Sequence, residues 1–174
     1  MKGLGIAIDS TRIDDVAKLF AADLKQTQRA AERALRKAIK WAKSRILREL
    51  PKTTNIPRKI IEGRIRIFAT GKLSVRLFVG GKPVAASRLS PKQTKRGVTA
   101  KGGRTFPGAF IAEHMTGKPV FKRMGRDRYP LEFQEVEVAD EVESVVWADV
   151  IPHFKDRFFT IFEQELRWET TRRR

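Results

Sequence analysis

The sequence predicts an α+β fold, in which a small, mostly antiparallel sheet is flanked by a long N-terminal helix and a kinked C-terminal helix. Residues 104–138 alternate short apolar runs with turn signals, as strands joined by hairpins do. Residues 64–79 alternate polar and apolar positions with period two. The stretches 10–50 and 140–174 lack glycine and space their apolar residues three or four apart, which is typical of helices. We expect the sheet to be the core on which the helices pack.

The chain has 174 residues, which suits one domain spanning 1–174 with a core of its own. Its 37 Lys and Arg against 20 Asp and Glu give a net charge of +17, with a pI near 10.8. Such a charge favours polyanionic partners, namely DNA, RNA or an acidic protein surface. The absence of cysteine excludes disulfides, thiolate metal ligands and a cysteine nucleophile.

No apolar run is long enough to cross a bilayer, so no membrane contact is expected. The first residues have too short an apolar stretch, and acidic residues too early, for a signal peptide. We therefore expect the protein to be made in the cytoplasm.

The N-terminal part begins with residues 4–8, a candidate edge strand, followed by Ser10 as a candidate N-cap. An apolar stripe then continues to Leu50, and Pro51 is expected to end the helix. About 40 residues at about 1.5 Å each would give a rod of about 60 Å. The polar residues 26–28 would mark a bend or a joint. A small sheet cannot cover such a helix, so we expect part of it to meet another subunit.

Basic residues crowd the second half of this helix, mostly off the apolar stripe. Either they form a solvated face, or they face a polyanion. They are Lys25, Arg29, Arg33, Arg36, Lys37, Lys40, Lys43, Arg45 and Arg48.

The middle of the chain is predicted to contain a short helix over 56–63, opened by Pro57. A β-hairpin follows, with strands over 64–68 and 72–79, and then a third strand over 83–89. The segment 90–105 contains no acid and breaks the strand pattern. It is expected to be a basic loop, either an interaction loop or a mobile surface loop. Its basic residues are Lys92, Lys95, Arg96, Lys101 and Arg104.

The C-terminal part is predicted to be a helix capped by Asp140 or Ser144. Pro152 should kink it or begin a second helix. Four phenylalanines in the stripe are expected to be core residues, namely Phe154, Phe158, Phe159 and Phe162. The final residues 172–174 form a basic tail.

Residues with catalytic or metal-binding chemistry are few. His153 has Asp149 and Asp156 at helical spacing but no second histidine or cysteine. Glu113 and His114 lack a positioned nucleophile. The Gly-Gly-basic turns at 80–82 and 102–104 lack the spacing of a phosphate-binding loop. We expect no enzyme activity, no cofactor and no metal, and no helix-turn-helix or zinc-finger readout of DNA.

Three motifs follow one another in the second half of the chain: TFPGAFI at 105–111, GKPVFKR at 117–123 and GRDRYPL at 125–131. This ordered set resembles the minor tail protein Z family of long-tailed phages, the tail completion proteins. The resemblance covers most of the chain in layout, and its specific residues are confined to 104–131. The segment 97–100 dilutes the basic loop relative to denser basic runs in the family.

The resemblance implies a structural virion protein of the phage neck, made in the host cytoplasm, which forms a ring at the head-proximal end of the tail and joins tail to head. The implied partners are further copies of itself in a hexamer, the neighbouring tail terminator and head–tail connector proteins, and possible contact with packaged DNA. The predicted interaction residues are Lys92, Lys95, Arg96, Lys101, Arg104, Phe106, Pro107, Phe110, Tyr129, Arg172, Arg173 and Arg174.

Two other functions stay open. A nucleic-acid-binding protein would hold phosphates with the basic helix and loop without reading sequence. The other is a hydrolase that would use Glu113, His114 or His153.

Overall fold

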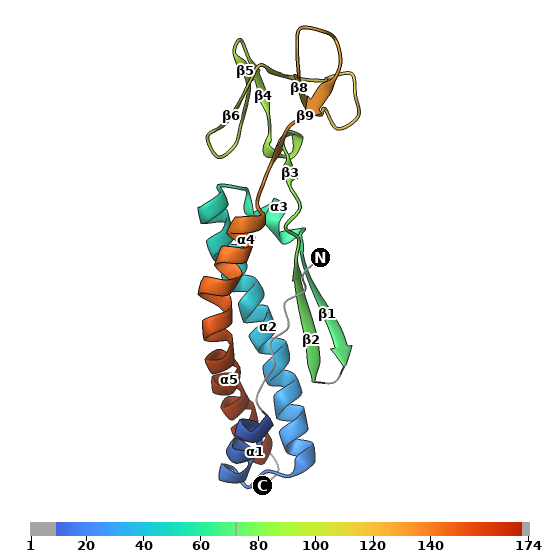
Figure 1. Cartoon of the computed structure of the whole chain (residues 1–174). Coiled ribbons are helices and arrows are strands. Elements are labelled where there is room, and N and C mark those ends of the chain that lie inside the picture. The colour runs from blue at the N-terminus through green and yellow to red at the C-terminus, as the bar shows by residue number, and fades with distance from the viewer. Residues whose placement is uncertain (1–9, 72, 172–174) are drawn as a thin grey trace. The chain divides into compact units, whose positions relative to one another are not determined.

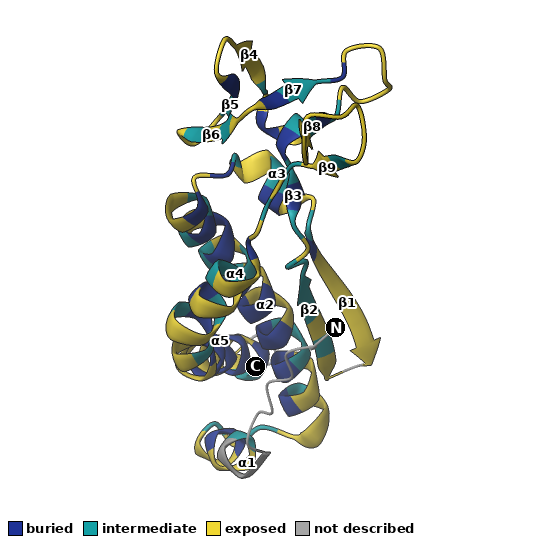
Figure 2. Cartoon of the chain, turned by 45° about the horizontal axis from the view of Figure 1, so that its top comes forward, coloured by how far each residue is buried: buried dark blue, intermediate teal, exposed yellow. Residues whose placement is uncertain are grey.

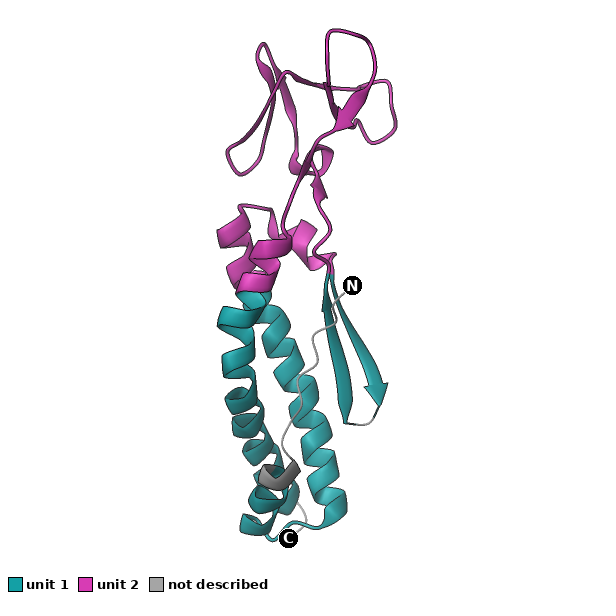
Figure 3. Ribbon diagram, viewed as in Figure 1, with its two compact units in different colours: residues 1–46, 65–79, 145–174 teal, residues 47–64, 80–144 magenta. Residues whose placement is uncertain are grey.

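The computed structural model describes residues 10–71 and 73–171, which divide into two compact units (Figure 3). Unit 1 contains residues 1–46, 65–79 and 145–174, and unit 2 contains residues 47–64 and 80–144. Long helices and small antiparallel sheets make the mixed α+β class that the sequence predicts. The edge strand predicted over 4–8 lies outside the described residues.

The N-terminal helical pattern forms two helices, α1 (Ser10–Leu19) and α2 (Leu24–Thr54). The joint comes before residues 26–28, where Ala21 has a φ of 48°. Asp23 and Gln26 then form a capping box: the Gln26 N–H donates to Asp23 Oδ1 at 2.7 Å, and the Asp23 N–H donates to Gln26 Oε1 at 2.9 Å. These bonds satisfy amides that a new helix leaves free, so α2 begins here.

The prediction that Pro51 ends the helix is wrong, because α2 continues through it to Thr54. Proline cannot bond the carbonyl four residues back, but only three helical residues follow it. The Thr54 hydroxyl donates to the Leu50 carbonyl at 2.6 Å. Asn55, with a φ of 49°, then ends the helix in the left-handed conformation that asparagine tolerates.

The C-terminal helix has the irregularity expected at Pro152. Helix α4 (Ala139–Val145) leads into a π-helical turn, η2 (Val146–Val150), and then into α5 (Ile151–Thr171). The Ile151 N–H donates to the Val146 carbonyl, five residues back. This wider turn precedes the proline, which has no N–H to contribute.

In unit 1, α2 and α5 lie side by side and antiparallel (Figure 1). The four predicted core phenylalanines of α5 are all buried. The Phe158 and Phe162 rings stack with centroids 5.9 Å apart, and Phe159 meets Phe158 edge-on at 5.2 Å. Alanines of α2 with almost no exposed surface include Ala30, Ala34 and Ala38. The helices therefore have a core of their own and do not depend on a sheet, contrary to expectation.

The predicted hairpin is confirmed as β1 (Ile65–Gly71) and β2 (Ser74–Val79), which pair antiparallel. The short helix predicted before it is α3 (Arg58–Glu62), preceded by Pro57. Instead of a strand over 83–89, only β3 (Val84–Ala85) is extended, and a 3-10 helix, η1 (Ala86–Leu89), follows it.

Unit 2 contains three further small sheets, all antiparallel. The strand β3 pairs with β10 (Glu135–Val136). The predicted loop 90–105 is instead largely a three-stranded meander: β4 (Lys92–Thr94), β5 (Gly97–Ala100) and β6 (Arg104–Pro107). The third sheet joins β7 (Ala109–Ile111), β8 (Val120–Arg123) and β9 (Leu131–Phe133), as the strand and turn pattern predicts.

A small apolar cluster holds this strand region together. Ala86, Val98, Ala109 and Val120 are buried in it, with Phe106 and Ile111 packed against them. In Figure 2 buried segments of the strands lie beside exposed turns. Within residues 10–71 and 73–171, no helix is long and apolar enough to cross a membrane.

Candidate interaction surface

The meander β4–β5–β6 carries most of the predicted interaction residues. Its segment has the composition of a loop, but two consecutive hairpin pairings make it ordered. Val98 pairs with Gln93 on one side and Phe106 on the other. Gln93 also joins the meander to β7, because its Oε1 accepts the Ile111 N–H at 2.9 Å and its Nε2 donates to the Ala109 carbonyl at 3.3 Å.

The basic residues of the meander fall into two groups. Lys95 and Arg96 form the turn between β4 and β5, beside Pro107, which pairs with Gly97. Lys101 begins the opposite turn, and Lys92 pairs with Thr99 near that end. All four cations are exposed, and none of them makes an ion pair with any described residue. The structure therefore presents two small cationic tips and not one continuous basic loop.

Arg104 is used within the chain. Its Nη2 donates to the Thr54 carbonyl, and its Nη1 lies 3.4 Å from the Asn55 carbonyl. Both carbonyls belong to the end of α2, where the helix leaves acceptors without partners. Cations near a helix C-terminus are also favoured by the helix dipole. Arg104 therefore anchors the turn that carries Lys101 to the helix end.

Phe106 and Phe110 differ in their surroundings. Phe106 packs on the buried cluster around Val98 and is mainly architectural. Phe110 begins a row of aromatic rings across β7, β8 and β9, in register with Phe121 and then Phe133. The ring centroids are 6.4 Å apart in the first pair and 5.6 Å in the second.

This row was missed from the sequence, since its members come from three strands whose register the sequence does not state. Phe133 is 40% exposed, and the Arg123 guanidinium lies 5.6 Å from the Phe110 ring centroid. A partly exposed aromatic row with a cation over it can contact protein or bases. The PGAFI and KPVFKR motifs supply two of its rings, which was the available signal.

Tyr129 lies in the connection between β8 and β9, 65% exposed, with the Arg128 guanidinium 5.7 Å from its ring centroid. The Met124 N–H donates to the Pro130 carbonyl at 3.2 Å and closes this connection. Tyr129 is thus available to a partner. Arg172, Arg173 and Arg174 lie outside the described residues.

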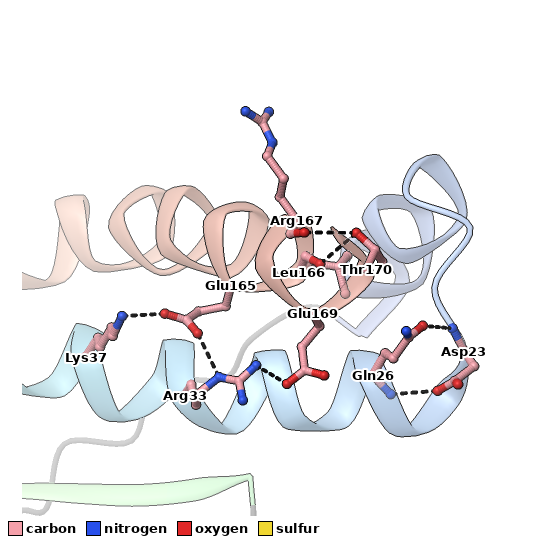
Figure 4. Close-up of polar contacts among 9 residues, drawn as sticks. All are labelled: Asp23, Gln26, Arg33, Lys37, Glu165, Leu166, Arg167, Glu169 and Thr170. Atoms are coloured by element: carbon pink, nitrogen blue, oxygen red, sulfur yellow. Dashed lines mark hydrogen bonds and ion pairs between the residues drawn. The ribbon is translucent and has the colours of Figure 1, made fainter. Parts of the chain in front are cut away.

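Several cations of the basic helix α2 are paired within unit 1 (Figure 4). Arg33 Nε donates to Glu165 Oε2 at 2.7 Å, and Arg33 also bonds Glu169, while Lys37 bonds Glu165. Nearer the other end, Arg45 forms a two-point pair with Asp149 at 2.6 and 2.5 Å. These pairs fix α2 against α5 and η2.

The Arg33–Glu165–Lys37 group sits partly out of water. Burial acts to raise the pKa of Glu165, but hydrogen bonds from Lys37 and Arg33 leave that pKa below its ordinary value. Burial also acts to lower the pKa of Arg33, but its bonds to Glu169 and Glu165 leave that pKa raised. Both groups are therefore ionised, and the attraction between them holds α2 against α5.

The residues considered for catalysis are not assembled into a site. Glu113 and His114 are exposed, and His114 makes no hydrogen bond to any described residue. His153 Nδ1 lies 2.9 Å from the Asp149 carbonyl, a contact within one helical turn. Among residues 10–71 and 73–171, no group of three His, Cys, Asp or Glu could hold a metal ion.

Comparisons with known proteins agree with the motif resemblance. The model of the family described as prophage minor tail protein Z matches residues 2–172. A relative named tail completion protein, from Escherichia phage N15, is 28% identical over 153 residues, which cover 80% of this chain and 79% of the relative. No solved structure matches the chain.

Proposed function

The chain belongs to the prophage minor tail protein Z family, and from this premise we propose that it completes a phage tail as a ring of subunits that joins tail to head. The ring, by family resemblance six-fold, would lie in the virion neck. The name of the phage N15 relative supports the completion role. In this proposal the whole chain acts as one structural component and carries no catalysis.

The observation that carries the proposal is the match over residues 2–172, together with exposed cations that form no ion pair among residues 10–71 and 73–171. The cationic tips at Lys95–Arg96 and Lys101 are suited to acidic neighbours, which in a phage neck would be the tail terminator, the head–tail connector or packaged DNA. Tyr129 and Phe133 offer apolar area with polar surroundings, as protein interfaces do.

Light scattering tests this role. The mass of the purified chain is measured alone and after mixing with assembled tails that lack it. The expected result is stoichiometric uptake as a ring, with the tails gaining a fixed multiple of the 19.9 kDa subunit. Tails that gain no mass would refute the completion role.

A second candidate, binding of nucleic acid without sequence readout, is favoured by the aromatic row with Arg123 above Phe110. It predicts tight DNA binding that weakens steeply with salt. Replacing both Lys95 and Arg96 with Gln should then reduce the slope of log affinity against log salt by about 2. The same double substitution at Lys155 and Arg157, exposed residues of α5 outside the basic helix and the meander, is the control. Weak binding with a shallow slope would refute this candidate.

A further inference from the structure

The hairpin β1–β2 has two chemically distinct faces. Residues directly opposite in an antiparallel pair share a face, and alternate residues of a strand point to opposite faces. One face is aliphatic throughout, made by Ile65, Ile67, Ala69, Val75, Leu77 and Val79. The other pairs arginine with phenylalanine twice: Arg66 faces Phe78, and Phe68 faces Arg76.

Much of this hairpin is uncovered. Phe68 is 46% exposed and Ile67 is 39% exposed, and each strand pairs only with the other among the described residues. A two-stranded hairpin alone is marginally stable in water. Arg66 and Arg76 are exposed, and neither makes an ion pair within the part of the chain that the structure describes. The hairpin thus combines apolar area with free positive charge.

Acidic and basic residues are concentrated in different segments of the chain, and the hairpin lies within a basic segment. Residues 63–112 contain no Asp or Glu and eleven basic residues. Residues 129–154 contain no Lys or Arg and seven acidic residues. These are Glu132, Glu135, Glu137, Asp140, Glu141, Glu143 and Asp149. One chain therefore carries both members of a complementary pair of surfaces.

The acidic segment, residues 131–144, is also open to a partner. It comprises β9, β10 and most of α4. Glu137, Asp140 and Glu143 are exposed and make no ion pair among the described residues. Phe133, 40% exposed, adds apolar area at its start. The segment thus complements the hairpin in charge and resembles it in combining charge with exposed rings.

We propose that the hairpin β1–β2 of one copy docks on the acidic segment of a second copy. The contact joins two different surfaces, so it repeats head to tail, and such contacts close into rings when the rotation allows. The inference rests on the proposed ring and names the surfaces that build it.

The chemistry favours a second copy over nucleic acid as the occupant. Phosphates and bases would use Arg66, Arg76 and the two phenylalanines, but they would leave the exposed part of the aliphatic face, such as Ile67, in contact with water. A protein partner buries aliphatic area as well, which is the main source of association energy. The matching acidic segment is present in every copy at equal concentration.

Charge exchange tests the contact in the full-length chain. The hairpin variant carries Arg66→Glu and Arg76→Glu, and the acidic-segment variant carries Glu137→Lys and Glu143→Lys. A control variant, Arg36→Glu with Lys40→Glu, changes the net charge as much as the hairpin variant on exposed positions of α2. Analytical ultracentrifugation over a concentration series measures association, and circular dichroism checks that each variant is folded.

Wild type and control are expected to self-associate, whereas each exchanged variant alone associates at least about tenfold more weakly, because like charges meet. An equimolar mixture of the two variants should regain wild-type association, since each reversed surface then meets its opposite. A monomeric wild type, a hairpin variant that associates normally, or a mixture that fails to recover would overturn the proposal. Binding to DNA fragments is measured on the same variants. A hairpin variant that loses DNA binding but self-associates normally would overturn the proposal in favour of nucleic acid.

Tail binding, measured in parallel, separates this inference from the proposed function. If the variants show the expected loss and recovery of association but the wild-type chain does not bind tails, the interface is supported and tail completion is refuted. A hairpin variant that joins tails with the wild-type number of copies refutes the interface and keeps tail completion.

Discussion

Replacing Gly97 with alanine should open the meander that carries the cationic tips. Gly97 has a φ of 141°, a backbone conformation that residues with a side chain rarely adopt and that costs them about 1–3 kcal/mol. A Cβ built there would lie 2.2 Å from the Phe106 carbonyl oxygen and 2.8 Å from the Gly108 nitrogen. Both atoms are backbone, so β6 itself must move, at a cost of about 1–3 kcal/mol for such overpacking.

Alanine also restricts the unfolded chain, which offsets about 0.4–1 kcal/mol of this destabilisation. We therefore expect Gly97→Ala to lower the free energy needed to open this region by about 3 kcal/mol. Hydrogen exchange of the β5 and β6 amides should accelerate about a hundredfold. Gly103→Ala is the matched control, since its φ of 71° carries strain but nothing lies within 4 Å of its Cβ. Equal acceleration in both variants would refute the steric argument.

Three further substitutions test the packing and the electrostatics. Phe162→Ala, which removes a fully buried α5 ring stacked on Phe158, should lower the free energy of unfolding by about 3–5 kcal/mol in denaturant titration, whereas Leu24→Ala, at a side chain 73% exposed, should change it by no more than about 0.5 kcal/mol. Glu165→Gln should reduce the dependence of stability on acid pH: the pKa of Glu165 is lowered in the fold, so its stabilisation is complete above the unfolded pKa of about 4.3 and is lost as the pH falls through the folded value. A variant with the wild-type slope below pH 5 would contradict the pairing with Arg33. Arg104→Met should cost about 1–3 kcal/mol and speed hydrogen exchange in residues 47–54, and unchanged exchange there would show that the arginine does not hold the helix end.

Local periodicity predicted the elements whose residues interact mainly with near neighbours. The hairpin of β1 and β2, the apolar stripe of α5 with its buried phenylalanines, and the irregularity before Pro152 are all present. The capping box of Asp23 and Gln26 was also available in the sequence, as an acid followed three residues later by glutamine, and it would have placed the helix joint.

Composition, short-range spacing and ordered motifs were sufficient to establish the α+β class, the family and the net charge of +17. Which charged side chains remain available to partners depends on contacts between segments far apart in the sequence. Arg45 and Arg104 looked as available as Lys95, yet one pairs with Asp149 and the other binds the end of α2. Strand register likewise turned a polar segment into the meander, because backbone pairing between neighbouring strands can order a chain that has few apolar side chains of its own.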